Sequence, residues 1–256
     1  MPRGRPRGRG RSLDGRAQGR RDGGRLIVLI RCIDFECTGI PSDEDRHAIC
    51  EIGFTEIVDG MVSGQTFAML VQPGRPMPCE SQAVHHISDA DLIGARPITD
   101  GLQMLMRGPP DFFAAHNAEY EQAFFQGGDV QWIDTYKVAL RLWPNAPSHS
   151  QQVLRYYLDL SCDRERAGPA HRAGPDSYVC AMLMAHILRD GRASVEEMLK
   201  WSKGPPLLHR VTFGKHKGTL WEDLPTDYLT WMLDKSDMDA GTKANARYRL
   251  KQRGAA

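Results

Sequence analysis

The chain has 256 residues, of which 41% are hydrophobic and 25% charged, and its formal net charge at pH 7 is +1. This composition favours one sizeable globular domain with a small appendage and excludes a fibrous or wholly disordered protein. The apolar run Leu26–Ile30 ends at Arg31, too early for a transmembrane span or a secretory signal.

Six cysteines occur, and none belongs to a Cys-x-x-Cys pair. They are Cys32, Cys37, Cys50, Cys79, Cys162 and Cys180. This pattern is typical of reduced thiols rather than of disulfides or zinc ligands. We therefore expect a cytoplasmic protein with no membrane partner.

Positive charge is concentrated at the N-terminus. Residues 1–25 contain nine arginines and two aspartates, a net charge of +7, so the remainder carries −6. A Gly/Arg-rich segment with few apolar residues predicts a disordered arm that binds nucleic-acid phosphates without reading sequence. The arginines of this arm that are expected to contact the phosphates are Arg3, Arg5, Arg7, Arg9 and Arg11. Pro2–Pro6 also matches an AT-hook core, and an artefact of start-site choice is a further alternative.

The first strand is predicted where Leu26–Ile30 leads into Ile33-Asp34-Phe35-Glu36-Cys37, before a sharp turn at Thr38-Gly39. Side chains two apart on a strand point the same way, so Asp34 and Glu36 project together. Paired carboxylates repel, and a divalent cation such as Mg²⁺ or Mn²⁺ removes that penalty. The alternative is a strand end with two solvated carboxylates.

Further strands and short helices follow in alternation. Strands are predicted over 48–58, 61–71, 112–115 and 130–133, with a hairpin turn at Asp59-Gly60. Helices are predicted around 81–87 and 98–106 and from Asn117 onward, and Asp134 is a candidate cap for the next helix. Three antiparallel strands followed by strands alternating with helices predict an α/β fold, a mixed sheet of the ribonuclease H-like type flanked by helices.

A loop over residues 161–175 carries His171, and helices at about 176–190 and 194–202 close this core. The residues Lys203–Pro206 form a linker. The predicted organisation is a disordered arm over 1–25, a main domain over 26–203, and a small C-terminal α+β appendage over 207–253.

The appendage is predicted to contain a hairpin around Gly214–Gly218 and two helices. Its aromatic residues include Phe213, Trp221, Tyr228 and Trp231. They are candidates for stacking on bases, although core packing is the favoured interpretation for most of them. Lys215 and Lys217 at the hairpin tip are candidate phosphate contacts, and a solvated turn is the alternative.

Three ordered segments resemble the motifs of the DEDDh family of 3′→5′ exonucleases. Asp34–Gly39 resembles D-x-E-x-T-G, His116–Glu121 resembles H-N-A-x-(F/Y)-D, and His171–Asp176 resembles H-x-x-x-x-D. Lys137–Pro144 is similar to the K-x-A-x-R-L-W-P stretch of exodeoxyribonuclease X-like members. The C-terminal tail also resembles theirs and separates them from plain DEDDh domains.

The resemblance implies a metal-dependent exonuclease that removes nucleoside 5′-monophosphates from the 3′ end of DNA, in DNA repair or processing. It implies two Mg²⁺ or Mn²⁺ ions, roughly 3.5–4 Å apart. Asp34 would bridge the ions, Glu36 and Asp176 would complete the inner site, and Glu121 would serve the outer one. His171 would take the proton from the attacking water.

Five residues are implied to bind the substrate. Thr38, Gly39 and Ile40 would hold the terminal nucleotide, with Ile40 as an apolar wedge or, alternatively, a core residue. His116 and Asn117 would contribute as well, although organising the helix turn is their alternative role.

The chain departs from the family at Glu121, where the motif has Asp. The longer side chain moves the carboxylate by about 1.5 Å. This departure keeps open the alternative of a nucleic-acid-binding module with a weakened site. Among enzymes, the alternative is a 3′→5′ exoribonuclease that trims RNA.

Overall fold

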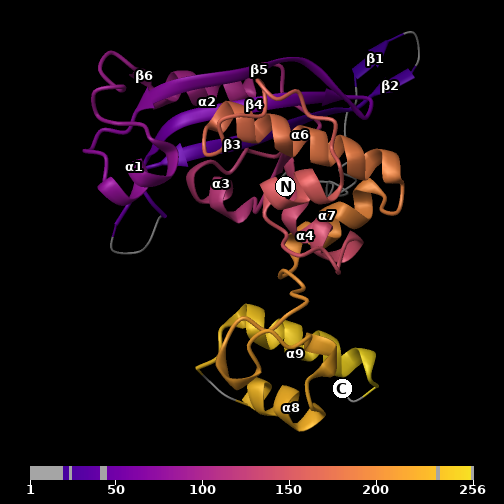
Figure 1. Cartoon of the computed structure of the whole chain (residues 1–256). Coiled ribbons are helices and arrows are strands. Elements are labelled where there is room, and N and C mark those ends of the chain that lie inside the picture. The colour runs from indigo at the N-terminus through magenta and orange to yellow at the C-terminus, as the bar shows by residue number, and fades with distance from the viewer. Residues whose placement is uncertain (1–19, 23–24, 41–44, 235–236, 255–256) are drawn as a thin grey trace, which may run out of the picture.

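A six-stranded mixed sheet forms the centre of the larger part of the molecule (Figure 1). The computed structural model describes residues 20–22, 25–40, 45–234 and 237–254. The strand order is β6-β5-β4-β3-β7-β8. The strands are β3 (Leu29–Cys37), β4 (Ile49–Val58), β5 (Met61–Gln72), β6 (Arg96–Pro97), β7 (Phe112–Ala115) and β8 (Gln131–Asp134). β3 and β5 are antiparallel to β4, whereas β7 is parallel to β3 and to β8. This confirms the predicted α/β fold.

Seven helices among the described residues accompany the sheet. They are α1 (Cys79–His85), α2 (Ile98–Met106), α3 (Glu119–Phe124), α4 (Thr135–Leu142), α5 (Gln151–Tyr157), α6 (Ala173–Asp190) and α7 (Val195–Lys203). Asp134 caps α4, accepting hydrogen bonds from the backbone N–H groups of Tyr136 and Lys137. The sequence prediction missed α5, which lacks both a capping hydrogen bond and an acid in its first turn.

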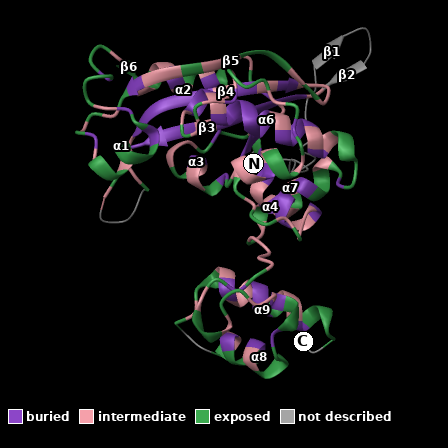
Figure 2. Ribbon diagram, in the orientation of Figure 1, coloured by how far each residue is buried: buried purple, intermediate pink, exposed green. Residues whose placement is uncertain are grey.

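The alternation of side chains along β3 divides the core between the two faces of the sheet. Ile30 and Cys32 pack in one apolar cluster with residues of α6. Ile33 and Phe35 pack in a second cluster, which includes Leu105 of α2. Figure 2 shows the buried residues concentrated along the central strands and α6. Asp34 and Glu36 therefore share the face of β3 that α6 covers.

A glycine allows the start of α6 to approach the sheet closely. Gly53 on β4 is the register partner of Asp34. A Cβ atom at Gly53 would collide with the backbone of Ala173, the first residue of α6. Because this position has no side chain, the first turn of α6 lies against the strands beside Asp34.

The C-terminal residues form a separate body with its own apolar core (Figure 1). It contains two short 3₁₀ turns, Gly214–His216 and Trp221–Asp223, and the helices α8 (Thr226–Asp234) and α9 (Ala240–Gln252). The predicted hairpin is reduced to one isolated bridge between Arg210 and Leu220, because the intervening residues turn in a 3₁₀ helix. The described part of this appendage is thus helical rather than α+β, and the domain boundaries at 203 and 207 stay a prediction.

The N-terminal prediction needs one correction. The segment 1–25 was expected to be disordered throughout, but Arg20–Asp22 forms strand β1, antiparallel to β2 (Arg25–Ile27). Residues 1–19 lie outside the described part. Among the described residues, no helix is long and apolar enough to cross a membrane.

Candidate active site

Three acidic side chains from two elements meet at one end of the sheet. Asp34 and Glu36 come from β3, and Asp176 comes from the first turns of α6. One oxygen atom from each of the three carboxylates lies within 4.8 Å of the other two. Glu36 and Asp176 are buried and Asp34 is partly exposed. Oxygen ligands at this spacing suit a hard divalent cation.

The crowding of these acids raises their pKa values. The pKa of Asp34 lies well above its ordinary range because of burial and the negative charges of Asp176, Glu36 and Glu121. Burial and the charge of Asp176 raise the pKa of Glu36 to about 8. Such a cluster costs free energy when ionised, and a bound cation would offset that cost.

Hydrogen bonds fix the carboxylate of Asp176. The backbone N–H of His171 donates to its Oδ2 at 2.6 Å, and the side-chain amide of Gln152 donates to its Oδ1 at 3.0 Å. The amide of Gln151 also donates to the carbonyl oxygen of Asp176 at 2.8 Å. Burial still raises the pKa of Asp176, although these donors oppose the rise. Sequence reasoning missed both glutamines, since they lie on α5 and belong to no motif.

Glu121 lies near this cluster but outside its group of three. It is buried on α3, and its Oε2 atom has no hydrogen-bond partner. Burial, together with the charges of Asp134 and Glu36, raises the pKa of Glu121 to about 8. A buried oxygen without a partner is costly, so this atom is well suited to a ligand that the protein itself does not supply.

His171 lies on the exposed loop that leads into α6. Its backbone adopts a left-handed conformation, with φ of 60°, which non-glycine residues adopt rarely. The hydrogen bond from its N–H to Asp176 holds this conformation in place. The side chain is exposed, and is therefore accessible to solvent beside the carboxylates.

An ion pair between Arg172 and Glu51 connects this loop to the sheet, and the motifs specify neither of these two residues. Arg172 donates to both carboxylate oxygens of Glu51, at 2.9 Å and 2.6 Å, and the N–H of Ala173 donates to Glu51 at 2.9 Å. Glu51 is the register partner of Glu36 across β3 and β4. An acid in the middle of the apolar strand 48–58 was the available sequence signal.

The residues predicted to hold a terminal nucleotide follow directly after β3. Thr38 is fully buried, and its hydroxyl accepts a hydrogen bond from the N–H of Ala48 at 3.0 Å. Gly39 has φ of 144°, and a Cβ atom there would collide with the ring of His47. Ile40 is 74% exposed, so the alternative that it is a core residue is wrong.

His116 and Asn117 form the turn between β7 and α3. The Nε2 atom of His116 donates to the carbonyl of His149 at 2.8 Å, and its Nδ1 atom lies 3.0 Å from the hydroxyl of Thr135. Burial lowers the pKa of His116 to about 4. Both ring nitrogens are engaged within the protein, which argues against its predicted substrate contact. Asn117 is exposed in a left-handed conformation, with φ of 73°.

The five arginines predicted to contact phosphates, Arg3, Arg5, Arg7, Arg9 and Arg11, lie outside the described residues.

The sequence profile of the exonuclease (RNase T) family matches residues 32–184, which include all the site residues described above. The chain belongs to this family, as its motifs predicted, and is a 3′-exonuclease of the DEDDh type that acts on nucleic acid.

Two curated relatives cover most of the chain. Exodeoxyribonuclease 10 of Escherichia coli (strain K12) is 28% identical over 212 residues, covering 82% of this chain and 92% of the relative. The DNA polymerase III subunit epsilon of Buchnera aphidicola is also 28% identical, over 242 residues, covering 83% of this chain and 96% of the relative.

Solved structures share the fold. Exonuclease X in complex with 5′-overhanging duplex DNA is 27% identical with a TM-score of 0.60, covering 68% of this chain and 99% of that one. A full-length 3′-exonuclease is 16% identical with a TM-score of 0.51, covering 64% of this chain and 61% of that one. The second likeness concerns the fold alone.

Proposed function

We propose that this protein hydrolyses DNA from the 3′ end, releasing nucleoside 5′-monophosphates, with two Mg²⁺ or Mn²⁺ ions held by its acidic cluster. The observation that carries the proposal is the convergence of Asp34, Glu36 and Asp176 within 4.8 Å. DNA is favoured as the substrate because relatives covering most of the chain are named an exodeoxyribonuclease and a DNA polymerase subunit. Such an activity would belong to DNA repair or processing.

The side chains present fit divalent cations. Asp34, Glu36 and Asp176 would hold them, and the unpartnered Oε2 of Glu121 would complete the set. When bound, the ions would activate the attacking water and neutralise charge on the phosphate and the leaving oxygen. Without them, four carboxyl groups with raised pKa values share one region of the protein.

His171 would act as the general base. The Arg172–Glu51 ion pair holds the loop of His171 against β4, and the backbone N–H of His171 donates a hydrogen bond to Asp176. Its side chain is exposed. A neutral imidazole can take the proton of a water molecule that attacks the terminal phosphodiester. The proton would then pass to bulk solvent, which reaches this loop directly.

The terminal nucleotide would lie against residues 38–40. The absence of a side chain at Gly39 lets the ring of His47 pack against this turn, which would keep residues 38–40 in place. The exposed Ile40 would contact the face of the last base. Asn117 would contact the substrate from the turn after β7, whereas His116 would keep this turn in shape through its two internal hydrogen bonds.

The test compares single strands of DNA and RNA of the same sequence, each labelled at the 5′ end, with Mg²⁺ or with EDTA. We expect the DNA to shorten stepwise in Mg²⁺ only, and a 3′-phosphate to block the reaction. Faster shortening of the RNA would identify an exoribonuclease instead. Cutting of a closed circle would identify an endonuclease, and binding without cleavage by the wild-type protein would identify a non-catalytic module.

The N-terminal arginines would strengthen the binding of long DNA. Removing residues 1–24 takes away eight arginines and two aspartates, a loss of six positive charges. Fewer counterions would then be released, so the dependence of affinity on salt should flatten while the hydrolysis of short substrates persists. Parallel salt dependences for the two proteins would contradict this role. A loss confined to A·T-rich duplex would support the AT-hook alternative.

A further inference from the structure

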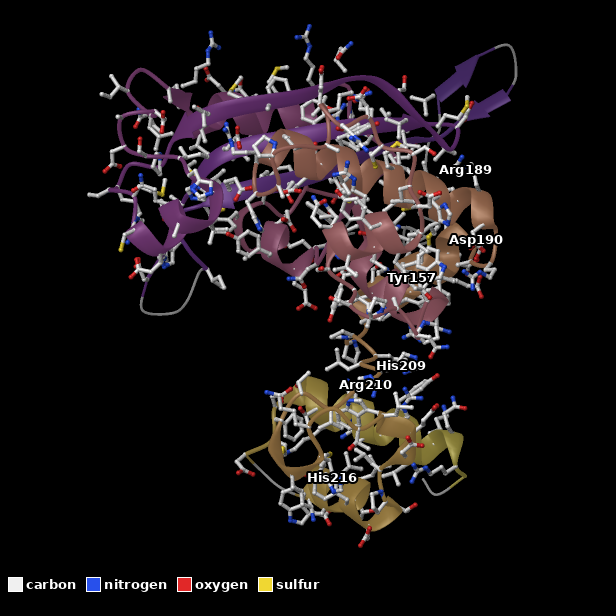
Figure 3. All side chains as sticks on the ribbon, in the orientation of Figure 1. Tyr157, Arg189, Asp190, His209, Arg210 and His216 are labelled. Carbon is white, nitrogen blue, oxygen red and sulfur yellow. The ribbon has the colours of Figure 1, made fainter. Side chains whose placement is uncertain are left out.

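The C-terminal appendage contains an open cleft outside the catalytic centre. The 3₁₀ turn Gly214–His216 and the helix α8 form its walls, and its volume is about 780 Å³. Binding sites for small molecules commonly measure roughly 300–1,000 Å³, so a nucleotide fits this space. Figure 3 labels His216 on this body, away from the sheet.

Aromatic rings form one wall of the cleft. The rings of Tyr228 and Trp231 are stacked, with centroids 5.3 Å apart and planes inclined by 15°. The ring of His216 lies 4.4 Å from that of Tyr228. Trp231 is 41% exposed, which is unusual for a side chain of its size. Of these rings, that of Trp231 is the most exposed to solvent.

The two tryptophans of the appendage, Trp221 and Trp231, differ in burial. Trp221 is fully buried, and it packs with Leu229 and Met232 of α8. Tyr228 and Trp231 are three residues apart, so they share a different face of the same helix. Tyr228 still packs against the apolar core, whereas Trp231 lies at the edge of the cleft.

Cations border the aromatic wall. The Nζ atom of Lys215 lies 5.1 Å from the centroid of the Tyr228 ring, and Lys217 follows on the same exposed turn. In the described part of the chain, neither lysine forms an ion pair with an acidic side chain. Asp227 also lines the cleft, and its carboxylate can accept hydrogen bonds from the amino groups of a base.

The charge of the chain is divided in a way that suits a polyanion at this end. Residues 26–206 contain 15 lysines and arginines against 24 acidic residues, a net charge of −9. Residues 207–256 contain nine against six, a net charge of +3. The net charge of the appendage therefore favours a polyanion more than that of residues 26–206 does.

We propose that this cleft binds single-stranded nucleic acid, with a base stacked on Trp231 and neighbouring phosphates contacted by Lys215 and Lys217. A base within a duplex has both faces covered by its neighbours, so the surface selects unpaired strands. Stacking on an aromatic side chain tolerates any base, and the two lysines contact the backbone common to all nucleotides. The cleft would thereby hold strands for the catalytic domain without reading their sequence.

The test measures binding by the full-length protein in EDTA, where no hydrolysis occurs, through the fluorescence anisotropy of a labelled oligothymidylate. We expect Trp231→Ala to weaken binding by roughly 5- to 100-fold, as removal of a stacking side chain does. Trp231→Phe should retain most of the affinity. The matched control is Met61→Ala, which removes another large exposed apolar side chain from the far end of β5.

A second variant addresses the lysines independently of the stacked rings. Lys215→Ala should reduce the slope of log Kd against log salt concentration by about 1, which corresponds to the loss of one phosphate contact. Lys251→Ala, an exposed lysine of the same body outside the cleft, is its control. The proposal is overturned if Trp231→Ala binds as wild type does, if duplex DNA shows the same loss, or if Lys251→Ala reproduces the effect of Lys215→Ala.

This inference is separable from the proposed exonuclease activity. Hydrolysis of a dinucleotide, which is too short to reach a second site, should be unchanged in Trp231→Ala, whereas the KM for a long strand should rise at constant kcat. If the wild-type protein hydrolyses nothing yet loses affinity on Trp231→Ala, the proposed activity fails and the binding site stands. The reverse pattern removes the binding site and leaves the activity.

Discussion

Arg172 and Glu51 join the loop that carries His171 to β4, the strand next to β3. The guanidinium of Arg172 forms two hydrogen bonds with the carboxylate of Glu51. Glu51 is only 3% exposed, so the contact is largely shielded from solvent. It also brings a positive charge near Glu36, whose pKa it lowers against the larger effects of burial and acidic neighbours.

We expect Arg172→Ala to reduce kcat by about 10- to 100-fold, because small displacements of a catalytic group have effects of this size. Arg172 would act by positioning His171, so its substitution should have little further effect in a His171→Ala protein. Arg192→Ala is the matched control, because it breaks a similar ion pair with Asp190 at the far end of α6 (Figure 3). Additive losses in the double variant would contradict the positioning role.

Asp34→Asn should abolish hydrolysis, since it removes the charge at the centre of the carboxylate group. The same change should raise the melting temperature of the metal-free protein near neutral pH, because the pKa of Asp34 is raised in the folded state and its ionised form is disfavoured there. Activity assays and thermal unfolding in EDTA test the two effects. Residual turnover close to that of wild type would contradict the proposed mechanism.

The stability of the metal-free protein should fall as pH rises. The pKa values of Glu36 and Glu121 increase from an ordinary 4.5 to about 8 on folding. Between these limits the folded state binds more protons than the unfolded state, so the free energy of unfolding decreases with increasing pH.

A bound cation reverses this effect by pairing with the ionised carboxylates. The increase in melting temperature on adding Mg²⁺ should therefore be larger near pH 8 than near pH 5, where the cation competes with protons. Thermal unfolding with and without Mg²⁺ at both pH values is the measurement. An equal increase at the two pH values would show that the cation binds elsewhere.

Glu121→Ala should lower activity strongly, by about 100-fold or more, if the buried carboxylate serves a metal ion. Glu121→Asp should keep or raise activity, because it restores the family's side chain. Glu121→Gln keeps the shape but removes the charge, so it should stabilise the metal-free protein near pH 8 while lowering activity. Wild-type rates in the alanine variant would remove Glu121 from the site. An inert wild type that Glu121→Asp activates would favour the binding-module alternative.

Much of the fold could be predicted from local sequence patterns. Strand periodicity located β4 and β5 within a residue or two and both ends of β7, because burial on a sheet imposes an alternation that short segments display. The break between β2 and β3 at Val28 was missed. Val28 donates its N–H to the side chain of Asp59, a distant partner that no local pattern reveals.

The appendage shows where local patterns fail. Glycines and lysines around residue 216 are typical of a hairpin, yet the structure contains a 3₁₀ turn there. Its two tryptophans, Trp221 and Trp231, looked alike in the sequence. Packing within the small core buried Trp221 and left Trp231 exposed, a choice that depends on which face of α8 meets α9.

The acids of β3, the His171–Asp176 spacing and most of the strands could be predicted from the sequence, because each depends on residues close together in the chain. How the proposed site residues are held depends on contacts between distant segments. Glu51 and Arg172 are 121 positions apart, and Gln152 and Asp176 are 24 apart. Such contacts exist because Gly53 lets α6 pack closely against the sheet and α5 folds over its first turns, and chain distance alone gives no measure of either approach.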